Sequence, residues 1–463
     1  MPNLFKRHPK RQGRHTPDLW PVGWVALLAL LIVGLLACGL FVGADALLTA
    51  KTASQKPVSV QDVIKTTITV LTLIGAVLAA LYAYRKQLLE EGASTRADET
   101  QLAERYAKAA EQLGHDQAAV RLAGVYTMAR LADDWPEQRK VCVDVLCAYL
   151  RMPYESDPAG AEYMKGEKEV RLTIIRTIRD HLQDPAASTT WCGLDLDFTG
   201  ADFDGGDFSG ATFSGGTVTF SHATFERSAV IFSGATFSGS TVTFYRARFL
   251  MSEVYFSDAT FSGGTVTFYG ASFSGSGPYF SDATFSGGTV AFYGASFSGG
   301  AVTFHGATFS GGTVAFESVA FSSTTLTCTN TTFSGGEVSF EGHGARFQDG
   351  AIFFGGATFS GGRVAFKNVT FSDNEIDFYG ARFLGGEVFF SRVTFSGSVE
   401  ASFSHATFSA GDIDFSNTTF VSGDIDFTDA TLTGSTVRFT DVLIHSAATI
   451  DWGPFPEIAA NRP

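Results

Sequence analysis

Phenylalanine recurs with a fixed rhythm through the C-terminal half of the chain, and no other feature of the sequence restricts the fold as strongly. From Phe198 to Phe213 the phenylalanines are five residues apart. From Phe213 to Cys328 the steps alternate between seven and five residues, and nineteen of these twenty positions are Phe. Such a fixed period is typical of a solenoid, in which each repeat buries its apolar face against its neighbours.

A smaller apolar residue stands two positions before each phenylalanine of this ladder, for example Val218 before Phe220 and Ala223 before Phe225. Two apolar residues separated by one polar residue are typical of a short strand with one buried face. The other positions are mostly Thr, Ser, Gly and Asp, and Gly-Gly pairs between strands can adopt the positive φ of corners. The pattern predicts short strands that coil around a core of phenylalanine rings.

The sequence leaves two candidate lengths for one coil, a single period of the ladder or two periods. The ladder repeats every twelve residues, but the tyrosines that follow a ladder phenylalanine, Tyr245, Tyr269 and Tyr293, repeat every 24. Four strands per coil, with four phenylalanines inside, fit this longer repeat best, although duplication of a segment of that length would leave the same trace. About eleven such coils at ~4.8 Å predict a rod on the order of 50 Å long.

The repeat resembles the pentapeptide-repeat family, whose unit has a small apolar residue, a polar one, a central Leu or Phe, and two polar or small ones. Residues 201–205 (Ala-Asp-Phe-Asp-Gly) and 211–215 (Ala-Thr-Phe-Ser-Gly) match this unit. The resemblance implies a mainly β fold, a right-handed parallel quadrilateral β-helix, which we assign to residues 193–451. Every second unit carries two extra residues, such as Gly216 and Thr217, so the square cross-section of the family is expected to be lengthened or skewed.

Two uncharged apolar segments near the N-terminus, residues 23–43 and 66–84, have the length of membrane-spanning helices. They predict a two-helix transmembrane hairpin over residues 23–86, with the lipid bilayer of the cell (plasma) membrane as a partner. Basic residues are denser outside the hairpin than in its connecting loop, so both termini are expected to be cytoplasmic. The chain would then be a multi-pass protein with a basic cytoplasmic tail, residues 1–22. The flanking basic residues are Lys6, Arg7, Lys10, Arg11, Arg14, Arg85 and Lys86.

A cleaved signal sequence would begin with a similar pattern. Leu35 to Gly39, around Cys38, resembles a lipoprotein cleavage box. The apolar run continues to Val42, as a membrane span would, so the hairpin is the favoured interpretation and cleavage at Cys38 remains the alternative.

Residues 87–190 change to helix-forming residues with a spacing near 3.6. Asp116 is the expected cap of the second helix and Pro136 a first-turn residue of the third. We predict a small bundle that covers the open end of the β-helix, since an exposed phenylalanine-lined end would aggregate. The expected helices are Glu99–Leu113, Ala118–Ala132, Glu137–Leu150 and Glu169–Leu182, with Pro153–Gly166 as a linker.

The helical region also offers an alternative interpretation. The stretch from Ala110 to Tyr126 resembles a helical segment that precedes the repeats in membrane-anchored pentapeptide proteins. In this interpretation Arg121, Tyr126 and the Asp133–Asp134 pair form a binding face.

No motif in the sequence points to catalysis: we find no Ser/His/Asp order with a nucleophile elbow, no P-loop, no HExxH helix and no paired carboxylates in an evident cleft. The cysteines form no CxxC pair, so they are expected to be buried thiols in a reducing compartment. We predict that the protein is not an enzyme and has no catalytic, cofactor-binding or metal-binding residue, no cofactor and no small-molecule substrate. The cysteines are Cys38, Cys142, Cys147, Cys192 and Cys328, and the histidines at outward or loop positions are His222, His305, His343, His405 and His445.

Acidic residues dominate the repeat region. Residues 193–463 contain 26 Asp and Glu against 10 Lys and Arg, a net charge of −16, whereas residues 1–192 contain 21 against 23. Direct binding of nucleic acid is therefore not expected, because it depends on basic side chains. The carboxylates gather near the two ends of the β-helix, at Asp195, Asp197, Asp202, Asp204 and Asp207 and at Asp412, Asp414, Asp424 and Asp426.

Two non-enzymatic functions remain. The favoured one is a membrane-anchored scaffold on the cytoplasmic face that binds a protein partner of unknown identity. The alternative is implied by soluble relatives in the family, some of which resemble duplex DNA and bind type II topoisomerases; the nearly uncharged middle coils and the membrane tether count against it. The rhythm slips at Gly342-His343 and Val399 are candidate binding loops, although neutral drift is the favoured explanation of both. Residues 452–463 are expected to form a C-terminal tail. Three Thr-Val-Thr rows resemble those of ice-binding solenoids but are thin support for that function.

Overall fold

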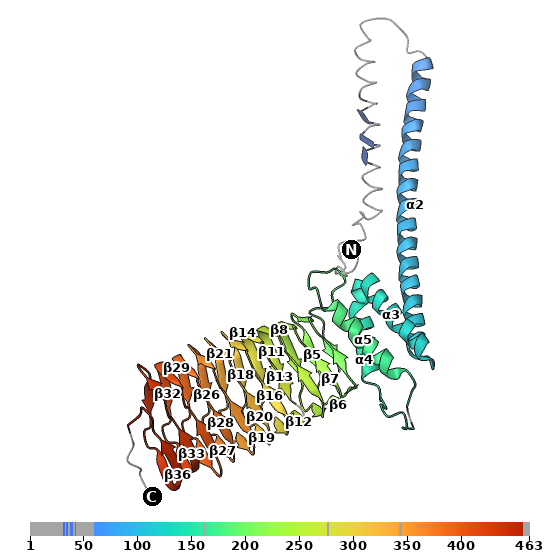
Figure 1. Ribbon diagram of the computed structural model, residues 1–463. Helices are drawn as coiled ribbons and strands as arrows, with labels where there is room; N and C mark the ends of the chain where they lie inside the picture. Colours follow the sequence, from blue (N-terminus) through green and yellow to red (C-terminus); the bar gives the residue numbers. More distant parts are fainter. Residues whose placement is uncertain are drawn as a thin grey trace, which may run out of the picture. The chain divides into compact units, whose positions relative to one another are not determined.

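The computed structural model describes residues 60–161, 163–275, 277–341 and 345–456, together with a few residues between 31 and 42. The predicted tail 1–22, most of the predicted span 23–43, the slip at Gly342-His343 and residues 457–463 lie outside the described residues. The chain divides into two compact units, Met1–Arg105 and Tyr106–Pro463 (Figure 1).

From residue 60 onward the first unit is one long helix, α2 (Val60–Leu113), whose end belongs to the second unit. Its stretch Ile68–Gln87 is long and apolar enough to cross a membrane and is not buried within the protein. This is the single candidate span among the described residues, and it overlaps the second of the two predicted spans. With 54 residues, α2 is about 80 Å long, so it extends well beyond a ~30 Å hydrocarbon layer.

The second unit opens with a helical cap. Its helices follow the predicted ones to within two residues at most ends, and Pro136 begins a short 3₁₀ helix as expected. The predicted cap at Asp116 is wrong: the N-cap of α3 is Gln117, without a capping side chain. The cap consists of α3 (Ala118–Asp134), η1 (Pro136–Gln138), α4 (Arg139–Leu150) and α5 (Glu167–His181).

The β-helix has about ten coils, from Leu196 to Asp451, and all its strands are parallel. Strand β8 (Thr236–Thr243) pairs in register with β11 (Thr260–Thr267), and β11 pairs with β14 (Thr284–Ala291). Phe261 thus lies between Phe237 and Phe285, each of them two periods of the ladder away. One coil therefore spans two periods, which is the longer of the two predicted lengths.

The four strand positions of each coil are shared between two sheets. The first sheet, which contains β8, comprises β1 (Leu196–Asp197), β4 (Thr212–Phe213), β5 (Thr217–Thr219), β8, β11, β14, β17 (Thr308–Phe309), β18 (Thr313–Ala315), β21 (Thr332–Phe333), β22 (Glu337–Ser339), β25 (Thr358–Phe359), β26 (Arg363–Ala365), β29 (Arg382–Phe389), β32 (Thr407–Asp414), β34 (Thr431–Leu432) and β35 (Thr436–Arg438). The second sheet comprises β2 (Asp202–Phe203), β3 (Gly206–Asp207), β6 (Thr224–Glu226), β7 (Ala229–Ile231), β9 (Arg248–Leu250), β10 (Glu253–Tyr255), β12 (Ser272–Ser274), β13 (Pro278–Tyr279), β15 (Ser296–Ser298), β16 (Ala301–Thr303), β19 (Ala320–Ser322), β20 (Thr325–Thr327), β23 (Arg346–Gln348), β24 (Ala351–Phe353), β27 (Thr370–Ser372), β28 (Glu375–Asp377), β30 (Thr394–Ser396), β31 (Glu400–Ser402), β33 (Thr419–Asp426) and β36 (Leu443–Asp451).

The phenylalanine ladder forms columns of stacked rings inside the coils. In one column Phe244 lies 4.6 Å from Phe268, and Phe268 lies 4.7 Å from Phe292, with the rings nearly parallel. Phe268 is fully buried, whereas the next residue, Tyr269, is 44% exposed. The inward and outward positions that the sequence predicts are therefore confirmed.

Tight turns join the two sheets. The N–H of Ala247 donates to the carbonyl of Phe244 at 3.0 Å, and Arg246 between them adopts a left-handed φ of 53°. At the Gly-Gly corners within the first sheet, close packing between coils determines which residue fits. A Cβ on Gly264 would lie 2.4 Å from the carbonyl oxygen of Ser240 in the preceding coil. Glycine is required there by the close approach of two backbones.

The slips in the rhythm leave the coils in register. Across the slip at Gly342-His343, Thr325 pairs with Ala351, two positions beyond the partner that the regular 24-residue coil would give it. Across the slip at Val399, Glu375 pairs with Glu400, one position beyond its regular partner. Val399 is fully buried. Val399 is therefore not available to a partner, whereas Gly397 and Ser398, which precede it and accommodate the extra residue, are exposed. Binding at this slip stays a prediction.

The C-terminal end of the β-helix is closed by an aromatic side chain. Phe455 is buried and packs edge-on against Phe408, Phe427 and Phe439, with ring centroids 5.1 to 5.9 Å apart. The first residues of the predicted C-terminal tail thus contribute to the core.

Candidate functional site

The first coil of the β-helix is bound to the helical cap through its aspartates. Lys168 of α5 lies 3.0 Å from Asp204. Arg151, just after α4, pairs with Asp197. Three more contacts join the parts: Arg179 of α5 pairs with Asp207, the amide of Gln183 donates to the carbonyl of Ser209 at 2.9 Å, and the N–H of Thr212 donates to the carbonyl of Leu182 at 2.7 Å. Most of the acidic residues at this end are therefore neutralised within the protein.

Hydrogen bonds within the first coil, together with a guanidinium of the cap, lower the pKa of two of these carboxyls. Partial burial opposes ionisation of Asp197, yet hydrogen bonds from Thr199 and the charge of Arg151 outweigh it, so the pKa of Asp197 lies below its ordinary value. The same balance of partial burial, hydrogen bonding and a neighbouring guanidinium lowers the pKa of Asp207. Both carboxylates are ionised at neutral pH and hold the cap against the first coil.

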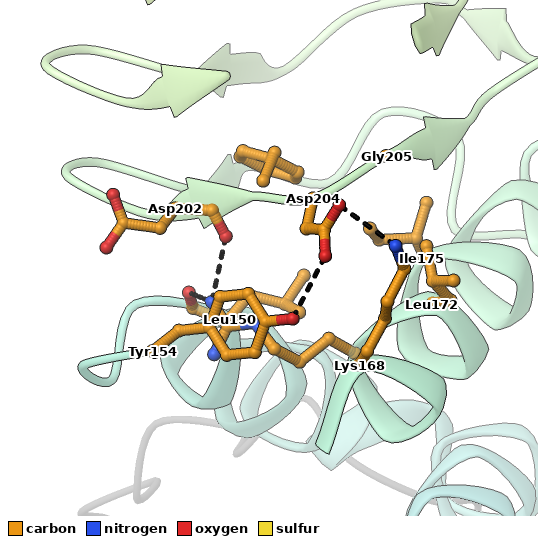
Figure 2. Close-up of a pocket in the computed structure, with 10 residues that line it drawn as sticks. Leu150, Tyr154, Lys168, Leu172, Ile175, Asp202, Asp204 and Gly205 are labelled. Atoms are coloured by element: carbon orange, nitrogen blue, oxygen red, sulfur yellow. Dashed lines mark hydrogen bonds and ion pairs between the residues drawn. The ribbon is translucent and has the colours of Figure 1, made fainter. Parts of the chain in front are cut away.

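A narrow cleft marks this junction (Figure 2). The hydroxyl of Tyr154 donates to Asp204 at 3.2 Å, and the Arg171 guanidinium lies over the Tyr154 ring while donating to the carbonyl of Asp202 at 3.2 Å. The space left between these groups is about what one water molecule needs. The cleft is a filled structural joint, and it has no room for a substrate.

A buried ion network continues from this joint into the cap. Arg121 is 2% exposed; its Nη2 lies 3.1 Å from Glu167, and its Nη1 donates to the carbonyls of His115 and Asp116 at 2.8 and 2.7 Å. The hydroxyl of Tyr149 donates to Glu167 at 2.9 Å. Burying these charges is tolerated because each is paired and hydrogen-bonded.

The predicted binding face on the helices is not a single surface. Arg121 lies inside the cap. Asp133 pairs with His181 at 3.2 Å, and the His181 ring stacks on the buried Trp191. Tyr126 is 61% exposed on α3. The contacts support the other interpretation of this segment, in which the helices cover the first coil.

The acidic residues near the other end divide between the two sheets. On the first sheet, Asp412 pairs with Arg438 at 3.1 Å. On the second sheet, six carboxylates lie on neighbouring strands, and none of them forms an ion pair within the described residues. Glu375, Glu400 and Asp424 form one in-register column, and Asp377, Asp426 and Asp451 lie in a second column in which Ser402 separates Asp377 from Asp426. These six carboxylates are called the acidic patch below.

The expected buried thiols are found at three positions. Cys142, Cys147 and Cys328 are buried, whereas Cys192 is half-buried and Cys38 is exposed, and all five are free. The prediction that all the cysteines are buried is therefore wrong for Cys192 and Cys38. Among the described residues no three His, Cys, Asp or Glu side chains come together as metal ligands would, and His222, His305 and His405 are exposed.

Comparison with known proteins agrees with the repeat geometry. Two models described as pentapeptide repeats match residues 195–216 and 220–272. These residues contain pentapeptide repeats. Among solved structures, the pentapeptide-repeat domain is similar to QnrB1, described as a plasmid-mediated fluoroquinolone resistance protein. A trypsin-treated form is 17% identical with a TM-score of 0.17, covering 48% of this chain and 91% of that one, and the full-length form is 16% identical with a TM-score of 0.15, covering 48% and 93%. A search of curated proteins found no match.

Proposed function

We propose that this pentapeptide-repeat protein is a membrane-anchored, non-catalytic scaffold whose β-helix binds a protein partner on the cytoplasmic face of the cell membrane. In this proposal residues 23–43 and 66–84 form the two spans of a hairpin, and both termini are cytoplasmic. The observation that carries the anchor is the apolar stretch Ile68–Gln87 of α2, which none of the described residues buries.

The geometry of α2 fits a membrane span. The hydroxyls of Thr69 and Thr72 donate to the carbonyls of Lys65 and Ile68 at 2.8 and 2.7 Å, so these polar groups are satisfied within the helix, as the hydrocarbon layer requires. Arg85 and Lys86 lie at the C-terminal end of the apolar stretch Ile68–Gln87, and basic residues at this place are typical of the cytoplasmic boundary of a membrane span.

A binding role fits the β-helix better than catalysis does. Its interior is filled with stacked rings, and the cleft at the cap is closed by its own side chains. The outer surface is available to a partner, and a rigid, capped rod presents it in a fixed arrangement.

The topology can be tested by labelling single cysteines in whole cells with a thiol reagent that does not cross membranes. A cysteine at Gln55, in the loop between the two proposed spans, should be labelled, and one at Ser404, on the β-helix, should be protected until the membrane is permeabilised. The exposed native Cys38 is first replaced by Ser. Labelling of the Ser404 variant in intact cells would refute the cytoplasmic assignment.

A second candidate function is binding of a strongly basic partner, and the acidic patch favours it. Glu400 and Asp424 lie on paired strands, about 4.8 Å apart along the rod, and no described basic side chain pairs with either. The aspartates at the cap, by contrast, are used internally. A partner that recognises charge would therefore bind near the C-terminal coils.

A further inference from the structure

One coil of the β-helix differs from the coils that follow it along strand β9 and the turns on either side of that strand. Residues 269–275 and 293–299 both read Tyr-Gly-Ala-Ser-Phe-Ser-Gly, whereas the equivalent residues 245–251 read Tyr-Arg-Ala-Arg-Phe-Leu-Met. The buried Ala and Phe are the same in all three, so the core is unchanged. Where the later coils carry glycine or serine, this coil carries four long side chains, Arg246, Arg248, Leu250 and Met251. They are called the Arg-Met patch below.

The Arg-Met patch lies on the outside of the rod. Arg246 and Arg248 are exposed, and neither forms an ion pair within the described residues. The Arg246 guanidinium lies over the ring of Tyr245, 5.2 Å from its centroid. Leu250 is half-buried, and Met251 is 61% exposed, more than any other large apolar side chain among the described residues of the β-helix. The patch therefore combines two unpaired positive charges with an exposed apolar side chain.

A row of tyrosines borders the Arg-Met patch. Tyr245, Tyr269 and Tyr293 lie in the turns that precede β9, β12 and β15. Their rings stack on one another at 5.4 and 5.1 Å, and the last two are each 44% exposed. Tyrosine, methionine and arginine are enriched where protein surfaces meet, and all three occur together here.

The Arg-Met patch is a basic surface on an acidic rod. No Asp or Glu occurs between Glu226 and Glu253, although residues 193–463 carry a net charge of −16. The two carboxylates that flank this stretch have partners of their own. Glu226 lies 3.6 Å from Arg227, and Glu253 accepts a hydrogen bond from the hydroxyl of Tyr255. The guanidinium groups of the patch are thus available to acceptors from outside the protein.

We propose that the Arg-Met patch binds an extended, acidic segment of a protein partner. This inference rests on the scaffold function proposed above and gives it a surface and a partner chemistry. Arg248 and Leu250 are alternate residues of one strand, about 6.6 Å apart, and an extended peptide presents alternate side chains at the same spacing. Carboxylates of the segment pair with the two guanidinium groups, which suit bidentate hydrogen bonding. An apolar side chain two residues further along the segment packs on Leu250 and Met251.

The charges around the patch favour a short segment over a long polyanion. In the strand column of Arg248, the two preceding coils carry Thr224 and then the exposed Asp202, so Asp202 lies about 10 Å away. A nucleic acid or an anionic membrane carries negative charge over a greater distance than this, and it would face that carboxylate as well. Five extended residues span about 17 Å along the strand direction, which is enough to contact the patch alone.

The test measures, by fluorescence anisotropy, how the detergent-solubilised full chain binds the peptide Gly-Ser-Glu-Ser-Glu-Ser-Leu-Ser-Gly, labelled with an uncharged dye. The unmodified chain should bind it at low salt with a Kd of about 100 µM or below, as expected of a ligand of this size. Arg246→Gly with Arg248→Ser should weaken binding at least about tenfold, because the charge-assisted hydrogen bonds are lost. Leu250→Ser with Met251→Gly should weaken it about fivefold through lost apolar contact.

Both double variants give this coil the residues of the next coil, so they should fold as that coil does and show the melt of the unmodified chain by circular dichroism. The matched control is Arg346→Ser. It removes an exposed arginine from the strand column of Arg248, four coils further along. The Kd of the peptide should stay unchanged in this variant.

A second peptide, in which glutamine replaces both glutamates, should not bind. The proposal is overturned if the acidic peptide fails to bind, if the glutamine peptide binds equally well, or if Arg346→Ser weakens binding as much as the double arginine variant does. Tighter binding of a short single-stranded DNA that depends on Arg246 and Arg248 would also overturn it, because the patch would then recognise a polyanion. These outcomes leave the membrane anchor and its topology to the cysteine-labelling experiment, so the two proposals fail separately.

Discussion

The ring of Phe268 shows what one residue contributes to this fold. It stacks between Phe244 and Phe292 and also contacts Phe273 at 5.9 Å. Each ring therefore fills the space between two coils, and its loss would leave a cavity that rigid neighbours cannot close. Its neighbour Tyr269 points outward, and its ring stacks on those of Tyr245 and Tyr293.

Truncating these two neighbours should have very different effects. Phe268→Ala should lower the free energy of unfolding by about 3–5 kcal/mol, the usual range for a buried aromatic side chain, whereas Tyr269→Ala should cost about 1 kcal/mol or less. Thermal and denaturant melts of the full chain measure both. Equal losses would show that the assignment of inside and outside is incorrect.

The buried cysteines should be chemically inert. Burial raises the pKa of Cys142 to about 11 and that of Cys147 to about 12, and it raises the pKa of Cys328 as well. At pH 8 these side chains remain thiols, and the thiolate is the reactive form. Mass spectrometry after brief maleimide treatment should find them unlabelled in the folded chain and labelled in guanidinium; rapid labelling of folded Cys328 would contradict its place in the phenylalanine column.

At the scale of elements, the strands and coils could be predicted because their signal is periodic. The alternation of Phe and smaller apolar residues determines which side chains are inside, and the spacing of Tyr245, Tyr269 and Tyr293 anticipates the register between coils. The joint between cap and β-helix has no periodic signal: Arg151 and Asp197 are 46 residues apart, and nothing in the sequence pairs them. The alternative interpretation of this segment places Arg121 on a binding face, but Arg121 is buried and pairs with Glu167, as the favoured capping bundle allows.

The joint should weaken in acid. Because the folded pKa values of Asp197 and Asp207 are depressed, the stability they contribute is complete above their unfolded pKa of about 3.9 and is lost as pH falls through the lower folded values. Asp197→Asn with Asp207→Asn should therefore lower stability at pH 7, by about 1 kcal/mol or less per exposed pair. It should also flatten the decline of stability below about pH 4.

The control for the joint is Asp202→Asn. The Asp202 carboxylate is exposed and has no ion pair within the described residues, so this variant should keep the pH profile of the unmodified chain. Melting temperatures measured between pH 2 and pH 7 provide the comparison. An unchanged acid profile in the double variant would mean that the two aspartates do not hold the cap.

At the scale of the whole molecule, the charge is arranged in zones with different uses. Asp197, Asp204 and Asp207 of the first coil pair with the cap. The strands of the first sheet are uncharged in the middle coils, and the acidic patch lies on the last coils of the second sheet. The sequence alone shows that carboxylates gather near both ends, but it cannot show which of them are already paired. The ion pairs leave the acidic patch as the surface most open to a basic partner.

The distribution of carboxylates along the rod distinguishes a scaffold from a mimic of DNA. A mimic needs carboxylates along most of its length, because a basic surface that recognises a duplex contacts many phosphates. We therefore expect that the detergent-solubilised full chain does not inhibit DNA supercoiling by gyrase at low salt, and that the triple variant Glu400→Gln, Asp424→Asn, Asp426→Asn behaves like the unmodified chain. If the alternative held, inhibition would be strong at low salt, would fade as salt shortens the Debye length from about 30 Å at 0.01 M to about 10 Å at 0.1 M, and would be abolished by the triple variant. Asp412→Asn, whose carboxylate already pairs with Arg438, serves as the control, because only loss of unpaired charge should matter.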